Sequence, residues 1–231
     1  RGLMEIRRRI LSDDAMREKI VRKYRIKNVT GYAMNSFVDF DTPMDIFAHV
    51  LIGSEGTLAY IISGELATIP LYDVYSSALL YFPDVTSAAA AAAPLGEKGA
   101  LAVEMMDYAS LVSYMGKRPD MPAGTTAMLV DFGASTPDEM AQRVAELTPQ
   151  FKALPSLSRM EPFTTTVAER AALWKMRDGI FPCVAGARVP GATVILEDIA
   201  APLGDLDRLV DGVQSLFAKY GYDGAIFRQA R

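Results

Sequence analysis

Apolar residues recur at helical spacing through the first part of the chain, with a largely basic polar face between them. The apolar positions are Leu3, Ile6, Ile10, Met16, Ile20 and Val21. Residues three and four apart lie on one face of a helix, so the pattern predicts an amphipathic helix. The polar pair Ser12 and Asp13 interrupts it, and either side chain can cap a second helix. We interpret the basic face as solvated, with a partner surface as the alternative.

A second apolar segment leads into a glycine-containing bend. Thr42 is a suitable N-cap and Pro43 suits a first turn, so a helix is predicted from there through Val50. The bend at residues 53–58 reads G-S-E-G-T-L, and residues 60–69 beyond it are predicted to form a strand that Pro70 ends.

Strand and helix patterns alternate after Pro70. Strands are predicted at 74–82, 101–105, 125–132, 163–166, 193–200 and 225–227, and helices at 85–95, 107–115, 136–154, 167–178 and 203–220. This order favours an α+β fold, a ferredoxin-like antiparallel sheet with helices on one face. We place a domain boundary near Pro70, which separates residues 1–70 from residues 71–231.

Composition narrows the classes of function. The chain has 231 residues, half of them apolar, which is enough for a substantial core in one large or two smaller domains. The net charge of -4 argues against a nucleic-acid partner, because neutralising phosphates requires an excess of Lys and Arg. Cys183 is the single cysteine, so this chain alone makes no internal disulfide and no cysteine-ligated cluster, and a reducing compartment is expected. The longest alanine tract, 88–93, is far shorter than the ~20 residues of a membrane helix.

Few residues offer catalytic chemistry. His49 is the only histidine, and its place on an apolar helix favours a structural role over acid–base work. One histidine without clustered carboxylates predicts no metal site, and no Gly-x-Ser-x-Gly elbow occurs. The glycine bend is more informative, because glycines let backbone N–H groups approach an anionic or carbonyl-rich ligand. An ordinary glycine turn is the alternative.

Arg177 is the candidate ligand of a substrate carboxylate. It shares a helix face with Trp174, and a guanidinium donates two parallel hydrogen bonds to a carboxylate. The alternative is a surface ion pair with a neighbouring acid such as Asp178, Glu169 or Glu197. Arg188, in a predicted loop at 182–191, is a weaker second candidate.

The adjacent acids Glu197 and Asp198 fall in the predicted strand 193–200. Successive strand residues point to opposite faces, so these two do not form a carboxylate pair.

Four segments together resemble a known family. Residues 27–32 read K-N-V-T-G-Y, residues 49–58 read H-V-L-I-G-S-E-G-T-L, residues 173–177 read L-W-K-M-R, and residues 197–202 read E-D-I-A-A-P. This wording resembles the FAD-linked oxidases of the vanillyl-alcohol-oxidase type, which include D-lactate, glycolate and D-2-hydroxyglutarate dehydrogenases. The last two segments are similar to the branch that is fused to an iron–sulfur region.

The resemblance implies that two parts of the chain correspond to different domains. Residues 1–70 correspond to the C-terminal part of an FAD-binding domain, and residues 71–231 to a substrate (cap) domain truncated at its C-terminus. It also implies that Arg177 holds the carboxylate of a 2-hydroxy acid. The residues implied to contact FAD are Gly53, Ser54, Glu55, Gly56 and Thr57, with Asn35 and Ile61 as weaker companions.

The resemblance also implies an activity. The full-length protein is expected to oxidise a D-2-hydroxy acid and to pass electrons to a quinone or an iron–sulfur partner, with FAD as cofactor and an iron–sulfur cluster in a region outside this chain. Catalytic histidines would follow the strand 225–227, so no catalytic residue is assigned and the chain alone is expected to be inactive and without tightly bound FAD. A cytoplasmic protein is expected, and a peripheral position at the inner membrane is left open. A homo-oligomeric state is also left open. The alternative is a non-catalytic ferredoxin-like binding or oligomerisation module.

Overall fold

The computed structural model describes residues 1–26, 28, 30–194, 199–222 and 224–229. Contacts between residues divide the chain into an N-terminal unit, which is mainly residues 1–69, and a larger unit of residues 70–197 and 203–231. The division falls where the sequence analysis places a boundary, near Pro70. Whether the first unit belongs to an FAD-binding domain stays a prediction.

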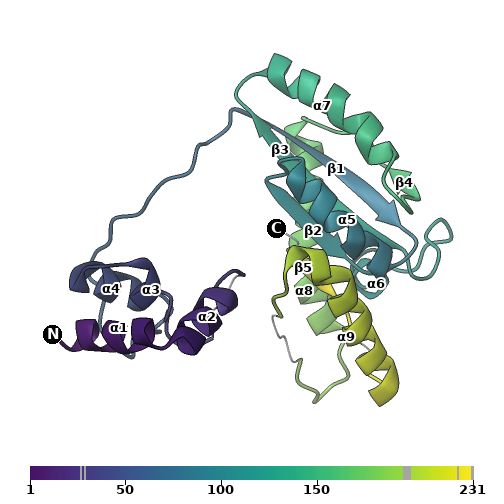
Figure 1. Ribbon diagram of the computed structural model, residues 1–231. Helices are drawn as coiled ribbons and strands as arrows, with labels where there is room; N and C mark the ends of the chain where they lie inside the picture. Colours follow the sequence, from purple (N-terminus) through teal and green to yellow (C-terminus); the bar gives the residue numbers. More distant parts are fainter. Residues whose placement is uncertain (27, 29, 195–198, 223, 230–231) are drawn as a thin grey trace. The chain divides into compact units, whose positions relative to one another are not determined.

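The N-terminal unit is helical, as predicted up to Val50. Its helices are α1 (Gly2–Ser12), α2 (Asp14–Lys23), α3 (Ser36–Asp39) and α4 (Pro43–Val50) (Figure 1). Both predicted caps are confirmed: Asp13 Oδ1 accepts the Met16 N–H at 3.0 Å, and Thr42 Oγ1 accepts the Asp45 N–H at 3.2 Å. Each cap satisfies a backbone donor that the first turn of a helix leaves unpaired. The core of this unit consists of Ile10, Ile20, Phe37, Ile46 and Val50.

The strand predicted at residues 60–69 is wrong. No helix or strand covers residues 59–72, and this stretch is the plain trace between α4 and the first strand in Figure 1. Its apolar side chains face solvent, with Tyr60 91% and Ile62 90% exposed. A strand needs a paired neighbour, and the described chain supplies none here, so β propensity alone does not produce one.

The larger unit is built on a five-stranded sheet with the order β4-β1-β3-β2-β5. Every pairing is antiparallel, and the longest runs from Val74↔Ala134 to Phe82↔Thr126. The predicted α+β class and the antiparallel sheet are confirmed. The strands are β1 (Val74–Phe82), β2 (Ala102–Met106), β3 (Thr126–Ala134), β4 (Arg159–Met160) and β5 (Phe227–Gln229).

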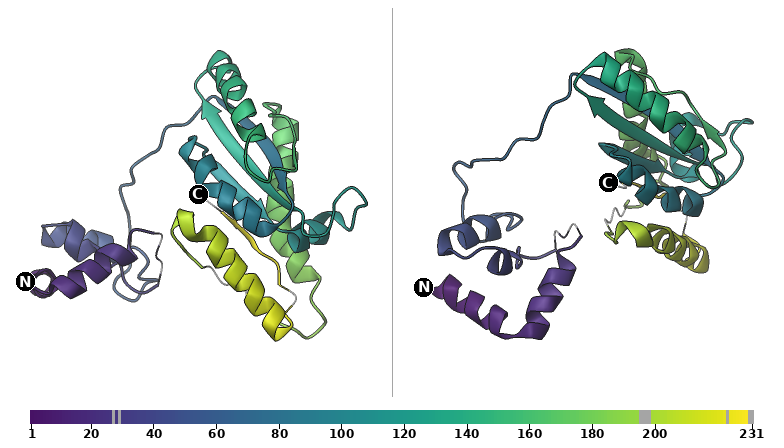
Figure 2. Two further views of the ribbon diagram at one scale, coloured as in Figure 1. Left: turned by 45° about the vertical axis from the view of Figure 1, so that its right-hand side comes forward. Right: turned by 45° about the horizontal axis from the view of Figure 1, so that its top comes forward.

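Helices cover both faces of the sheet, which corrects the expectation of one covered face. One core joins β1, β2 and β3 to α5 (Val85–Glu97), α7 (Pro137–Lys152) and α9 (Leu206–Tyr220). On the opposite side, Leu79 and Leu129 pack with α6 (Tyr108–Met115) and α8 (Val167–Gly186). Figures 1 and 2 show α5 and α9 side by side on one side of the strands. The central strand β3 is therefore buried at every position, as expected for a strand covered on both sides.

Two predicted elements at the edge of the sheet have different bounds. The strand expected at 163–166 is reduced to one bridge, Ser77↔Thr164, and the regular pairing lies earlier, in β4. Pro162 separates the two and has no N–H to donate to a ladder. The strand expected at 193–200 is absent at residues 193, 194, 199 and 200, and its remaining residues, including the Glu197 and Asp198 pair, lie outside the described residues.

Helix α8 is longer than predicted. It continues past Asp178 and includes Pro182, so the loop expected at 182–191 begins only after Gly186. A proline removes the hydrogen bond to the carbonyl four residues earlier, here that of Asp178. Asp178 is exposed, so water can satisfy that carbonyl, while Ile180 keeps the helix packed on the sheet.

Candidate functional site

The glycine bend is a pair of successive turns directly after α4. The Ser54 N–H donates to the Leu51 carbonyl at 3.1 Å, and the Thr57 N–H donates to the Ser54 carbonyl at 3.0 Å. Gly53, Glu55 and Gly56 have φ angles of 77°, 51° and 76°. Positive φ at both central residues of the second turn is the geometry in which glycine carries no steric penalty, whereas Glu55 does. The predicted conformational role of the glycines is confirmed.

This turn also presents free backbone donors. Ser54 is buried, but Gly53, Glu55, Gly56 and Thr57 are exposed. Within the described part of the chain, the N–H groups of Gly53, Glu55 and Gly56 have no hydrogen-bond acceptor. Unpaired N–H groups in a turn attract an anionic or carbonyl oxygen. This turn therefore offers backbone donors to an anionic or carbonyl oxygen, and its contact with FAD stays a prediction.

A hydrogen-bond chain joins the two N-terminal sequence motifs. Thr57 Oγ1 donates to the Ser54 carbonyl at 2.6 Å, so the hydroxyl of Tyr32, 2.9 Å away, donates to Thr57. The Tyr24 hydroxyl in turn donates to the Tyr32 carbonyl at 2.7 Å and accepts the Met34 N–H at 3.0 Å. Tyr32, the last residue of the motif at 27–32, thus supports the glycine turn.

The two weaker flavin candidates make no such bond to the turn. Asn35 Nδ2 donates to Asp39 Oδ2 at 2.9 Å, within α3 and its cap. Ile61 lies in the segment without regular structure and is 57% exposed. Their proposed contact with FAD stays a prediction.

His49 has the structural role that the sequence analysis favours. Its Nδ1 lies 2.7 Å from the Asp45 carbonyl, one helical turn earlier, and its ring stacks on Phe40 with centroids 3.8 Å apart. Both contacts fix the ring against its own unit.

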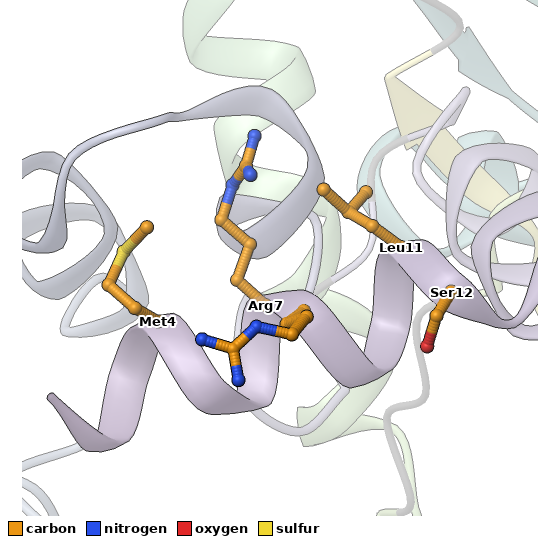
Figure 3. Close-up of a pocket in the computed structure, with 5 residues that line it drawn as sticks. Met4, Arg7, Leu11 and Ser12 are labelled. Atoms are coloured by element: carbon orange, nitrogen blue, oxygen red, sulfur yellow. The ribbon is translucent and has the colours of Figure 1, made fainter.

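The pocket over α1 does not combine groups from several elements. It measures about 410 Å³ and is lined by Met4, Arg7, Arg8, Leu11 and Ser12, all from one helix (Figure 3). Arg7 is already bound, because its Nε donates to the Phe40 carbonyl at 2.9 Å and its Nη2 to Asp41. We assign no chemistry to it.

In the larger unit, Arg177 pairs with a carboxylate that the sequence analysis did not consider. Its Nε donates to Glu104 Oε2 at 2.9 Å, and its Nη1 lies 3.8 Å from Asp178 Oδ1. The Glu104 side chain on β2 is 6% exposed and that of Arg177 is 31% exposed. Burial raises the pKa of Glu104 more than the hydrogen bond and charge of Arg177 lower it. The predicted neighbour Trp174 is half-buried on the same side of the sheet.

A second arginine of α8 forms a more complete pair about two helical turns earlier. Arg170 Nη2 donates to both oxygens of Asp131 at 3.1 Å, and its Nε donates to Ser77 Oγ at 3.1 Å. Its guanidinium also lies 5.0 Å from the centre of the Tyr75 ring. Sequence reasoning missed Arg170, Asp131 and Glu104. The available signal was a carboxylate inside each of two otherwise apolar predicted strands, because buried charges require partners.

Other candidate groups are held in local contacts. Arg188, the second substrate candidate, donates to the carbonyls of Ala185 and Ala192 and is exposed. A second pocket of about 300 Å³ contains Arg118, whose charge is offset by Asp120. The described residues contain no group of three His, Cys, Asp or Glu side chains placed to hold a metal ion. Across the same residues, no helix has the length and apolar character needed to span a bilayer.

The larger unit is therefore an α+β domain, an antiparallel sheet with helices on both faces and two arginine–carboxylate pairs on one of them. Residues 73–231 match the family described as FAD linked oxidases, C-terminal domain. The match covers more than half of the chain, so the chain belongs to the FAD-linked oxidase family. Members of this family are flavin-dependent oxidoreductases. Among curated proteins, no sequence matches the chain.

Proposed function

We propose that the chain is part of a flavin-dependent dehydrogenase that oxidises a D-2-hydroxy acid of the lactate, glycolate or 2-hydroxyglutarate type. Electrons would pass to a quinone or to iron–sulfur centres outside this chain. Residues 71–231 would bind the substrate, and residues 1–70 would contribute to the flavin site. The observation that carries the substrate class is Arg177, a partly exposed guanidinium whose terminal nitrogens make no hydrogen bond to the described residues, inside the region that matches the family.

Each unit would contribute binding groups. The unpaired N–H groups of Gly53, Glu55 and Gly56 would hold oxygens of the flavin. When bound, the flavin supplies the acceptor for the hydride, which carries both electrons of the alcohol oxidation. Arg177 would bind the substrate carboxylate and so fix the position of the neighbouring carbinol carbon. No described residue of this chain is assigned as the base that takes the hydroxyl proton.

Anaerobic reduction of the flavin tests this proposal. The full-length flavoprotein is mixed with D- and L-2-hydroxy acids, and the flavin absorbance is followed. We expect a D-acid to bleach it, and Arg177→Ala to lose most of this reduction. Arg188→Ala is the matched control, because that guanidinium binds only backbone carbonyls and should be dispensable.

Two outcomes would contradict the proposal. A full-length protein that purifies without flavin would favour the alternative, a non-catalytic binding or oligomerisation module. A yellow protein that no 2-hydroxy acid bleaches would retain the family and reject the substrate class. Equal bleaching of the parent protein and Arg177→Ala would retain the substrate class and reject the role of Arg177.

A further inference from the structure

We propose that Glu104 is a positioning residue for Arg177. Its buried carboxylate binds the Nε of the guanidinium and directs the Nη1–Nη2 edge toward the carboxylate of the substrate. The inference rests on the proposed function, in which Arg177 binds that carboxylate.

The position of Glu104 is fixed by the sheet. It lies on β2, between β3 and β5, where it pairs with Leu129 on one side and Gln229 on the other. A side chain on an inner strand has less freedom than one on an exposed loop or a helix end. Arg177, by contrast, is a long side chain on a helix. The rigid partner in this pair is therefore the carboxylate.

The contact divides the guanidinium into a used and an unused edge. An arginine offers a planar fork of five N–H donors and binds carboxylates bidentately. Only Nε of Arg177 donates to Glu104. Nη1 is 3.8 Å from Asp178, beyond hydrogen-bond distance, and in the described residues neither terminal nitrogen has an acceptor. The side chain is 31% exposed, so part of it is accessible to a ligand.

Arg170 shows how a more fully hydrogen-bonded pair on the same helix differs. Its Nε donates to Ser77 and its Nη2 donates to both oxygens of Asp131, and its side chain is only 18% exposed. A pair that served stability alone would be expected to use its donors in this way. Glu104 instead receives one donor and leaves the others of Arg177 uncommitted.

The energetics of Glu104 also point away from a purely stabilising role. A buried carboxylate with one donor does not regain its full desolvation cost, and burial raises the pKa of Glu104.

The charges around Arg177 also bear on how a substrate could bind. One cation faces the two anions Glu104 and Asp178, so the formal local charge is -1. Long-range attraction alone does not favour an anionic substrate there. Binding must depend on directed hydrogen bonds, and therefore on the orientation of the guanidinium.

The test separates orientation from charge in the full-length flavoprotein. Glu104→Met removes the acceptor and retains most of the volume, whereas Glu104→Gln keeps an acceptor oxygen and removes the charge. We expect Glu104→Met to raise KM for the 2-hydroxy acid about tenfold while kcat changes less than about threefold, because binding is lost equally from ground and transition states. Glu104→Gln should restore KM to within about threefold of the parent protein, since its oxygen still accepts the Nε–H.

Asp131→Asn is the matched control, because it alters the other pair of α8 and should leave KM unchanged. In an Arg177→Ala background, Glu104→Met should have no further effect on KM, as expected when one residue acts through the other. Flavin content and circular dichroism establish that each variant is folded. If Glu104→Met does not fold, Glu104→Asp decides the question, since it withdraws the carboxylate by one methylene and should raise KM at least about threefold.

The possible failures are distinguishable. An unchanged KM in Glu104→Met, or in Glu104→Asp if that variant decides, together with lost reduction in Arg177→Ala, would reject the positioning role and leave the proposed function intact. Unchanged reduction in Arg177→Ala would reject substrate binding by Arg177, and this inference with it. Equal effects of Glu104→Met and Asp131→Asn on KM would mean that Glu104 has only a structural role, and would contradict the proposal.

Discussion

The two arginines of α8 bind the same face of the same sheet in different ways. Arg170 donates to Asp131 and Ser77 and packs on Tyr75, so its cation is almost wholly committed. Arg177 gives a single hydrogen bond to Glu104 and keeps nearly a third of its side chain exposed. Residue type is the same in both cases, and the surrounding acceptors differ.

This difference indicates how one helix can be both anchored and functional. A buried pair with all its partners holds the helix to the sheet, although replacing the whole pair by apolar groups would often be as stable. A pair with unused donors contributes less to stability and can bind a ligand. Four predictions test this contrast, in order of decreasing effect.

Breaking the Arg170–Asp131 pair should have the largest effect on the free energy of unfolding. Asp131→Ala leaves Arg170 Nη2 and the Ser77 hydroxyl without their acceptor, and removing one partner of a buried pair costs about 3–5 kcal/mol in the free energy of unfolding. Chemical denaturation measures this loss. A loss smaller than about 1 kcal/mol would show that water replaces Asp131 easily, and that the two pairs do not differ in the way described.

Breaking the open pair should cost less. Arg177→Met leaves Glu104, which can bind a proton because burial already raises its pKa, so we expect a loss of only about 1 kcal/mol in the free energy of unfolding. The same denaturation experiment applies, with Arg170→Met as the matched variant. The comparison fails if Arg177→Met destabilises the protein as much as Arg170→Met does.

The pH dependence of the free energy of unfolding should reveal the titration of Glu104. A carboxyl group whose pKa in the folded state lies above its ordinary value of 4.5 stabilises the fold when the pH is below 4.5. This contribution is lost as the pH rises through the pKa of the folded state. Relative to Glu104→Gln, the parent protein should therefore lose stability as the pH rises from about 4 toward 7. Parallel denaturation curves at several pH values measure the difference. A difference that stays constant, or that grows in favour of the parent protein, would contradict the assignment.

The smallest effect should come from the exposed neighbour of Arg177. Asp178 is 71% exposed and 3.8 Å from Nη1, so Asp178→Asn should change the free energy of unfolding by less than about 0.5 kcal/mol. If Arg177 binds an anionic substrate, removing this competing charge should lower KM slightly, by less than about threefold. Steady-state kinetics at low and moderate salt provides the check. A raised KM would mean that Asp178 orients the guanidinium.

Features specified within a few residues were predictable. The caps Asp13 and Thr42 were read from spacing and are present, because a cap bonds to an N–H only three residues away. The strand at Val74–Phe82 matches its prediction at both ends. The positive φ angles of Gly53 and Gly56 follow from the residue type as well.

Features that depend on a distant partner were not predictable in the same way. The expected strand at 60–69 has apolar, β-branched residues but no neighbour to pair with in the described chain. Helix α8 passes Pro182 because the packing of Ile180 continues the helix beyond the point where local rules end it. Sequence reasoning identified Arg177 by its type and position, but it listed Asp178, Glu169 and Glu197 as partners and did not list Glu104.

The sequence by itself determined the α+β class, the helix caps, the glycine turn and the arginine on α8, because each follows from residue type and short-range spacing. The tertiary structure decided which faces of the sheet are covered, and that Glu104 is the hydrogen-bond acceptor of Arg177, while the neighbouring Asp178 forms a longer ion pair at 3.8 Å. That choice depends on the docking of α8 against β2, across 73 positions of the chain. The physical reason is that burial and hydrogen-bond partners of a charged side chain are properties of packed elements, and local sequence does not specify how distant elements pack.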